Sequence, residues 1–349
     1  MASDHATHEP SDRTPGDAAH QAPGHLAHHA PGAATHQAPG DAMHPAPGHP
    51  APGHLTHQES GRAARPASRS FEDFLAEGAA VPTAGWDFSW FEGRATEARP
   101  SWGYAVSMAE RLTGADAVLD IQTGGGEVLD FALGRLLHAP PLTDPTHAPP
   151  LTDPAQSTHP RAPLLTVATE GWPPNVAKAT ALLRPRGVAV VASPEDAALP
   201  FADGAFDLVV SRHPVRPHWR EIVRVLRPGG TYFAQHVGPA SAFELVEHFL
   251  GPLSEGQHGA RHPDRERAEA EAAGLEIVDL RAERLRMEFY DIAAVVHFLR
   301  KVIWMVPGFT VEAYEAQLRS LHERIRSEGR FVAHSSRHLV EARRATPAD

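Results

Sequence analysis

The feature that most constrains the fold of this chain is the stretch Val118-Leu119-Asp120-Ile121-Gln122-Thr123-Gly124-Gly125-Gly126-Glu127. An apolar run ends in an acid, a glycine-rich turn follows, and Val128-Leu129-Asp130-Phe131-Ala132 is typical of an amphipathic helix. This order predicts the first strand, loop and helix of a nucleotide-binding α/β domain, because glycine lets backbone approach a ligand closely. The dinucleotide fingerprint G-x-G-x-x-G/A is not met, since a template that starts at Gly124 places Leu129 at its third small position.

The composition of the chain shows that many of its residues cannot belong to a hydrophobic core. Residues 1–68 are dominated by Ala, Pro, Gly and His, with repeated A-P-G units and almost no large apolar side chains. Burial there cannot offset the entropy of ordering the chain, so we predict a disordered tail. Its histidines are consistent either with weak metal binding or with sequence drift. We expect no metal site in the folded domain.

A second low-complexity segment interrupts the domain. Residues 138–146 and 147–155 form a tandem duplication of H-A-P-P-L-T-D-P followed by Thr or Ala. So much proline excludes both a helix and a central strand. We therefore predict that residues 139–161 are a surface loop inserted between the first helix and the second strand.

Charge and cysteine usage exclude several classes of protein. The 349 residues contain no cysteine, which excludes disulfides, and no run approaches the roughly 18 to 20 apolar residues of a membrane span. A signal-peptide pattern is also missing. The net charge of −11 argues against a protein that tracks nucleic-acid phosphates. We expect a cytoplasmic monomer or homodimer that binds neither nucleic acid nor membrane.

The remainder, residues 69–345, alternates strands and helices and is predicted to be one α/β domain with a parallel sheet covered on both faces. The predicted strands are 117–121, 164–169, 187–192, 206–211, 231–237, 275–281 and 331–341. The predicted helices are 126–137, 173–183, 218–226 and 290–306.

Several motifs, in one order, resemble those of class I S-adenosylmethionine-dependent methyltransferases. Asp120, Gly124 and Gly126 match the family's motif D-x-G-x-G-x-G, with Gln122 in place of its first glycine. The pattern L-P-F…F-D-L-V…L-x-P-G-G then follows at 199–201, 206–209 and 226–230. The resemblance covers nearly all of 70–345. It is to the methyltransferase type 11-like subgroup, whose substrates are small molecules.

The resemblance implies a Rossmann-like, doubly wound, mostly parallel sheet of seven strands whose last two form an antiparallel edge hairpin. It also implies S-adenosyl-L-methionine as cofactor and methyl transfer by in-line displacement to a small-molecule acceptor. Two alternatives stay open. One is a nucleic-acid (RNA) methyltransferase. The other is a non-catalytic S-adenosylmethionine-binding protein, which the altered residue Gln122 would fit.

The resemblance implies cofactor contacts at the carboxyl ends of the strands, where open α/β sheets bind ligands. Asp120 would bind the cofactor's ammonium group, and Glu170 would bind the ribose hydroxyls unless it is a solvated loop acid. Either Glu195 or Asp196 would bind the adenine amino group. The expected cofactor-binding residues are Asp120, Gln122, Thr123, Gly124, Gly126, Glu170, Glu195, Asp196 and Ser211.

Methyl transfer from a sulfonium can be accelerated by alignment alone, so no base signature is required. His213, just after the fourth predicted strand, is a candidate general base or else a side chain that packs under the cofactor. His236, which ends the fifth strand, is the second candidate base.

The amino-terminal segment 70–113 is rich in aromatic residues. Such a segment either folds over the site as a lid or caps the hydrophobic core. The predicted acceptor-binding residues are Trp86 and Trp90 from this segment, and Tyr290 and Trp304 from the helix predicted at 290–306.

Overall fold

The computed structural model describes residues 69–83, 88–138 and 162–346. The predicted tail 1–68, the predicted insertion 139–161 and Trp86 lie outside the described residues. Within the described ranges, no helix is both long enough and apolar enough to cross a membrane.

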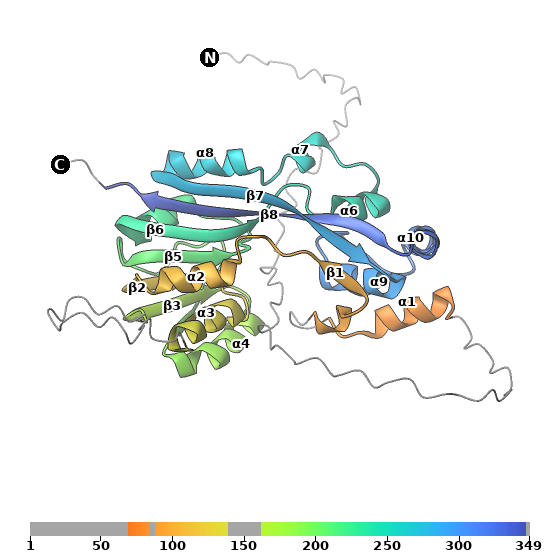
Figure 1. The fold of residues 1–349 in the computed structure, drawn as a ribbon, viewed down its shortest axis with the longest axis horizontal. Coiled ribbons are helices and arrows are strands. Elements are labelled where there is room, and N and C mark those ends of the chain that lie inside the picture. The colour runs from red at the N-terminus through yellow and green to blue at the C-terminus, as the bar shows by residue number, and fades with distance from the viewer. Residues whose placement is uncertain (1–68, 84–87, 139–161, 347–349) are drawn as a thin grey trace, which may run out of the picture.

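The centre of the fold is one mixed sheet of order β1-β7-β8-β6-β5-β2-β3-β4 (Figure 1). The five strands from β4 to β6 are parallel, and β8 is antiparallel to both β6 and β7. The doubly wound α/β fold with an antiparallel pair at one side is thereby confirmed. The strands are β1 (Ala95–Glu97), β2 (Ala117–Asp120), β3 (Leu165–Glu170), β4 (Ala189–Ala192), β5 (Phe206–Arg212), β6 (Leu226–Val237), β7 (Leu275–Phe289) and β8 (Phe331–Arg344).

The sheet has eight strands where seven were predicted. The extra strand, β1, pairs antiparallel with Met287–Phe289 at the end of β7. Three residues are too few for a periodic pattern, so only the partner strand makes this segment a strand. Strand β7 also runs eight residues past its predicted end at Arg281. Its alternation of buried Leu285, Met287 and Phe289 with more exposed residues is a period-two signal that could have been found.

Helices cover both faces of the parallel strands and pack around two separate cores on those faces. On one face, Met108, Leu129 and Leu183 pack with Phe233. On the other, Trp219, Ile222 and Ala270 pack around the strands. The helices are α1 (Phe71–Ala80), η1 (Ser89–Phe91), α2 (Tyr104–Leu112), α3 (Glu127–His138), α4 (Pro173–Leu183), η2 (Arg184–Arg186), α5 (Trp219–Val225), α6 (Phe243–Leu250), α7 (Glu255–His258), α8 (Pro263–Ala273), α9 (Ile292–Lys301) and α10 (Glu315–Glu328).

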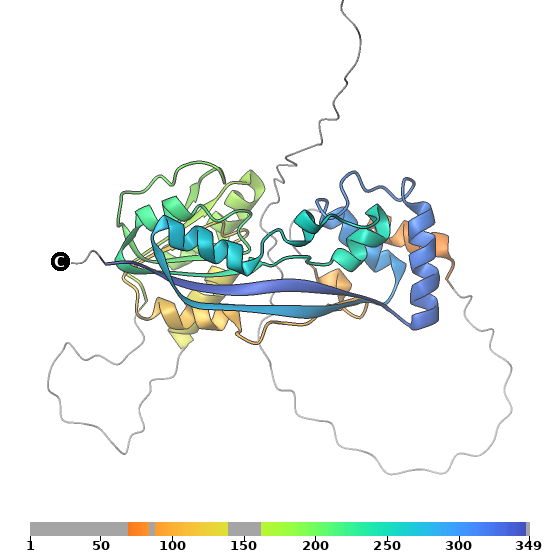
Figure 2. The same cartoon turned by 90° about the horizontal axis from the view of Figure 1, so that it is seen from above.

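A second lobe, formed by α1, α6, α9 and α10, lies at the far end of β7 and β8 (Figure 2). It has its own core, to which Phe71 of α1, Leu245 of α6, Val295 of α9 and Leu321 of α10 contribute, together with Phe289 of β7. The sequence predicted only one α/β unit, because the residues of this second core come from both ends of the chain.

Helix α9 is shorter than the predicted helix 290–306. It begins after Asp291, whose carboxylate accepts a hydrogen bond from the Ala294 backbone N–H at 2.8 Å. It ends at Lys301, because Val302 has left the helical conformation. Val295 on this helix is fully buried.

The acid of the Phe206-Asp207-Leu208-Val209 motif joins two strands at their amino ends. The Asp207 carboxylate accepts hydrogen bonds from the backbone N–H groups of Asp116 at 2.8 Å and Ala117 at 3.0 Å. It also lies 3.2 Å from a guanidinium nitrogen of Arg227. This position is at the opposite end of the strands from their carboxyl ends, so the motif acid is structural.

We expect Asp207→Ala to lower the free energy of unfolding by about 2 to 3 kcal/mol, because two backbone donors lose a charged acceptor. Urea denaturation measures the change. The matched control is Asp203→Ala, whose side chain is 80% exposed and whose ion pair should contribute at most about 0.5 kcal/mol. Equal stability of the two variants would contradict the structural role.

Candidate functional site

The candidate site lies at the carboxyl ends of the parallel strands. Strand β2 has β3 on one side and β5 on the other, so the chain connections leave β2 in opposite directions. Such a switch point is where open α/β sheets bind ligands. Asp120 ends β2, Glu170 ends β3 and Arg212 ends β5.

The glycine-rich loop after β2 needs residues that tolerate left-handed backbone conformations. Gly124 and Gly126 have φ of 64° and 86°. A Cβ on Gly126 would lie 2.9 Å from a methyl carbon of Leu183, so a glycine there also lets α3 pack against α4.

Gln122 has a left-handed backbone conformation, with φ of 57°, which glycine adopts without strain. Its side-chain oxygen accepts a hydrogen bond from the Val215 backbone N–H at 2.7 Å. The Gln122 side chain thus connects the glycine loop to the segment that follows β5.

This arrangement gives a prediction for two variants of Gln122 that both lose the tie to Val215. In Gln122→Ala, residue 122 still has the left-handed backbone conformation that is strained for any residue with a Cβ. In Gln122→Gly this strain is absent, because glycine adopts the conformation freely. We expect Gln122→Gly to be more stable than Gln122→Ala by about 1 to 2 kcal/mol in urea denaturation. A more stable alanine variant would show that the loop leaves the left-handed conformation without cost.

Asp120 is a buried carboxyl, 5% exposed, that accepts a hydrogen bond from the Thr123 hydroxyl at 2.6 Å. Its pKa is raised to about 7, chiefly by burial, with the hydrogen bond from Thr123 opposing the shift and the nearby Glu170 adding to it. A carboxylate with so little solvation is ready to bind a cation.

Glu170 is also buried and holds the glycine loop. Its two carboxylate oxygens accept hydrogen bonds from the backbone N–H groups of Gly124 at 2.8 Å and Trp172 at 2.9 Å. Burial raises its pKa, although these N–H groups lower it. Glu170 is therefore not a solvated loop acid; its expected contact with ribose remains a prediction.

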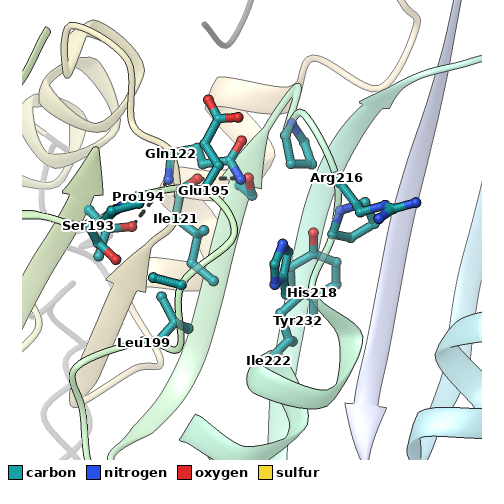
Figure 3. Close-up of a pocket in the computed structure, with 15 residues that line it drawn as sticks. Ile121, Gln122, Ser193, Pro194, Glu195, Leu199, Arg216, His218, Ile222 and Tyr232 are labelled. Atoms are coloured by element: carbon teal, nitrogen blue, oxygen red, sulfur yellow. Dashed lines mark hydrogen bonds between the residues drawn. The ribbon is translucent and has the colours of Figure 1, made fainter. Parts of the chain in front are cut away.

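Two cavities flank Gln122, which lines both. The Asp120 cavity has an empty volume of about 340 Å³. The Ser193 cavity has an empty volume of about 440 Å³ and reaches from Ser193 and Glu195 to Tyr232 (Figure 3). The Asp120 cavity is lined by Tyr104, Met108, Asp120, Gln122, Thr123, Gly124, Val128 and Arg212.

The structure distinguishes the two candidate acids that follow β4. Glu195 lines the Ser193 cavity, whereas Asp196 is exposed and lines neither of the two cavities. Ser211 also lines the Ser193 cavity and donates its hydroxyl hydrogen to the carbonyl of Ile121 at 2.8 Å. Sequence reasoning missed Arg212, although its position at the carboxyl end of a predicted strand was a usable signal.

His213 is held by hydrogen bonds in a buried position. The Trp102 indole N–H donates to Oε1 of Gln235 at 2.7 Å, so the Gln235 amide nitrogen, 2.8 Å from Nε2 of His213, donates to that ring nitrogen. The Nε2 lone pair is therefore occupied. His213 lines neither cavity, and the geometry favours the packing alternative; a base role remains a prediction.

His236 belongs to a buried network on the face of α8. Its Nδ1 lies 2.5 Å from a carboxylate oxygen of Glu266, and Nε2 of His338 lies 2.7 Å from the same oxygen. The Tyr232 hydroxyl lies 3.0 Å from Nε2 of His236. Two imidazoles and a carboxylate are also metal-ligand types. Here one oxygen accepts both imidazole N–H groups, whereas Nδ1 of His338 is buried and has no hydrogen-bond partner among the described residues.

The predicted acceptor-binding aromatics that the structure describes lie in or beside the second lobe. Trp90 packs edge-on against His297 of α9, with ring centroids 5.1 Å apart. The Tyr290 hydroxyl donates to Glu288 at 2.6 Å. Neither of these side chains nor Trp304 lines the Asp120 or Ser193 cavity, so their role toward an acceptor remains a prediction.

A family model described as "Methyltransferase domain" matches residues 155–234, the stretch that includes β3, Glu170, the Ser193 cavity's loops and most of β6. The sheet order and the site at the strand ends agree with this match. Over this stretch the chain is similar to a methyltransferase domain.

Three solved structures from different organisms are among those similar to this chain. A protein from Bacillus halodurans C-125 described as a candidate methyltransferase is 18% identical, with 69% of this chain and 99% of that chain covered and a TM-score of 0.45. The YcgJ protein of Bacillus subtilis is 16% identical, with 69% and 99% covered and a TM-score of 0.40. Phosphoethanolamine N-methyltransferase 2 of Haemonchus contortus, solved with phosphomonomethylethanolamine and S-adenosylhomocysteine, is 15% identical, with 81% and 62% covered and a TM-score of 0.41. Comparison with curated protein sequences finds no match.

Proposed function

We propose that this protein transfers the methyl group of S-adenosylmethionine to a small-molecule acceptor in the cytoplasm. The observation that carries the proposal is the pair of cavities on either side of Gln122, each with an acid in its lining. A cofactor with an amino-acid group at one end and adenine at the other has the right chemistry to occupy both. The net charge of −11 supports a small-molecule acceptor over a nucleic acid.

Each end of the cofactor has a partner in this proposal. Asp120 binds the ammonium group, for which a poorly solvated carboxylate is suited. Glu195 accepts a hydrogen bond from the adenine amino group. Glu170 accepts hydrogen bonds from the ribose hydroxyls, and its hydrogen bond from the Gly124 backbone N–H lengthens when the cofactor binds.

The reaction in this proposal depends on alignment rather than on a protein base. The acceptor's lone pair attacks the methyl carbon opposite the departing thioether, and the cofactor leaves as S-adenosylhomocysteine. Holding the two reactants in line accounts for much of the acceleration in such a displacement. The occupied ring nitrogens of His213 and His236 agree with this scheme.

Calorimetry with S-adenosylhomocysteine tests the cofactor site. We expect the wild type to bind, Glu170→Gln and Glu195→Gln to bind at least about tenfold more weakly, and Asp196→Asn to bind like the wild type. Binding that Asp196→Asn weakens and Glu195→Gln does not would reverse the assignment of the adenine acid. No binding by the wild type would overturn the proposed function.

A transfer assay separates the remaining alternatives. Tritiated S-adenosylmethionine is incubated with the protein and with either a low-molecular-weight metabolite extract or total RNA. Label in small organic products supports the proposal, and label in RNA supports the nucleic-acid alternative. Cofactor binding with no transfer to either pool would favour a non-catalytic binding protein.

A further inference from the structure

Three side chains with metal-ligating atoms meet in the core between the sheet and α8. His236 of β6 and His338 of β8 are directly paired across the two strands, so both imidazoles lie on the same face of the sheet. Nδ1 of His236, Nε2 of His338 and a carboxylate oxygen of Glu266 all lie within 4.8 Å of one another. All three residues are buried. Ligand atoms from two strands and a helix therefore converge on one point.

The surroundings of this cluster favour a cation at that point. The rings of Trp219 and Tyr232 lie against His236, with centroids 6.0 and 6.1 Å from that of the imidazole. With both imidazoles neutral, the form that binds metals, the cluster carries the negative charge of Glu266. A buried charge is costly unless an opposite charge compensates it, and a divalent cation among the three ligand atoms would supply that compensation.

The hydrogen bonds around the two imidazoles allow each ring to direct a lone pair toward such a cation. Nε2 of His236 lies 3.0 Å from the Tyr232 hydroxyl, which can donate or accept. When the proton is on Nε2, Tyr232 accepts it in a hydrogen bond and Nδ1 is available as a ligand. Nδ1 of His338 has no hydrogen-bond partner among the described residues, so no second bond holds this ring in one tautomer.

We propose that His236, Glu266 and His338 bind a divalent transition-metal ion, and that Zn²⁺ fits this set of ligand atoms best. Two nitrogens and one oxygen are ligand types of zinc, whereas Mg²⁺ and Ca²⁺ prefer oxygen alone. Zinc–ligand bonds would place the ligand atoms about 3.3 Å apart. The two imidazole–carboxylate distances, 2.5 and 2.7 Å, would then have to open by less than about 1 Å. A water molecule or the second carboxylate oxygen can complete a tetrahedral shell.

The ion would link β6 and β8 to α8 rather than touch the cofactor, because none of the three ligands lines the Asp120 or the Ser193 cavity. No metal site in the folded domain was expected from the sequence. Ligands at positions 236, 266 and 338 are too far apart along the chain to form a local motif, so only the tertiary structure brings them together.

Thermal unfolding of the full chain tests the site. The protein is treated with EDTA and then melted without metal, with Zn²⁺ or with Mg²⁺. The test variants are Glu266→Gln and His338→Gln, which each replace one ligand, and the matched control is Glu269→Gln, which removes an exposed carboxylate from the same helix. Residues 1–68 also contain histidines, so the comparison of variants, and not the number of ions bound, assigns the site.

We expect Zn²⁺ at about 100 times its Kd to raise the unfolding midpoint of the wild type by about 5 to 10 °C, and Mg²⁺ to leave it unchanged. Glu266→Gln and His338→Gln should lose this shift, and Glu269→Gln should keep it. The positive charge of Arg261 acts on both Glu266 and His338 and opposes a second cation. Arg261→Gln should therefore bind zinc about two- to fivefold more tightly than the wild type.

Two results would overturn the proposal. One is a wild type whose midpoint does not respond to Zn²⁺, and the other is a response that folded Glu266→Gln and His338→Gln retain. If neither variant folds, fluorescence decides without changing a ligand, because Co²⁺ at the cluster would quench Trp219 beside His236. Quenching that is lost in Trp219→Phe supports the site, and its absence from the wild type overturns it. The proposed methyl transfer is unaffected by either outcome.

Discussion

Asp120→Asn is expected to make the protein more stable and to abolish tight cofactor binding. The pKa of this carboxyl is 3.8 in the reference state and about 7 in the folded protein, with burial as the main cause. Between these pH values the folded state keeps a proton that the unfolded chain has released. The stability associated with the protonated carboxyl is therefore complete below about pH 4 and is lost as the pH rises through 7.

At pH 8 the loss amounts to about 4 kcal/mol, because each pKa unit corresponds to about 1.4 kcal/mol. Asparagine is never ionised and still offers an oxygen to the Thr123 hydroxyl, so Asp120→Asn should recover most of this energy at pH 8 and little at pH 4. Urea denaturation of both proteins at the two pH values measures the difference. Equal free energies of unfolding of the wild type and Asp120→Asn at pH 8 would show that the Asp120 carboxylate is well solvated.

The same ionisation governs binding in the wild type. An ammonium group needs the carboxylate form of Asp120, so affinity for S-adenosylhomocysteine should fall by roughly tenfold per pH unit below about pH 7 and level off above it. Asp120→Asn should bind at least about 100-fold more weakly at pH 8 and show no such pH dependence. An asparagine variant with wild-type affinity would remove Asp120 from the binding site.

The second large effect is expected at the buried network on the face of α8. Glu266→Ala leaves the imidazole N–H groups of His236 and His338 without their acceptor, at positions 2% and 0% exposed. A buried donor that loses its partner costs about 1 to 3 kcal/mol, so the variant should lose about 2 to 5 kcal/mol of unfolding free energy.

Urea denaturation of Glu266→Ala can be compared with that of Glu269→Ala on the same helix. Glu269 is exposed and pairs with Arg265 one turn away, an arrangement that contributes less than about 0.5 kcal/mol. Glu266→Gln keeps an oxygen acceptor and should fall between the two alanine variants. A Glu266→Ala protein as stable as Glu269→Ala would mean that water replaces the carboxylate without cost.

Much of the parallel sheet was predictable because its signals are local. The apolar run that ends at Asp120, the glycine turn and the helix after it follow one another within 20 residues. Helix 173–183 was predicted with its exact bounds, since proline at its first positions and an apolar face both mark it in the sequence.

The second lobe was not predictable from such signals. Its core joins Phe71 near one end of the described chain to Phe331 near the other. Strand β1 exists only because β7 extends far enough to pair with it. Local periodicity can indicate a single element such as α9, but it does not indicate which distant segments pack together.

The same distinction between local sequence signals and tertiary contacts applies to the site residues. The sequence by itself determined which residue types stand at the strand ends, because strand, turn and acid are adjacent along the chain. Only the tertiary structure decided their environments: that Asp120 is desolvated, that Glu195 rather than Asp196 lines a cavity, and that Gln122 holds the segment after β5. The chemistry of a side chain depends on its burial, its hydrogen-bond partners and its charge pairing. All three arise from segments that meet only after folding.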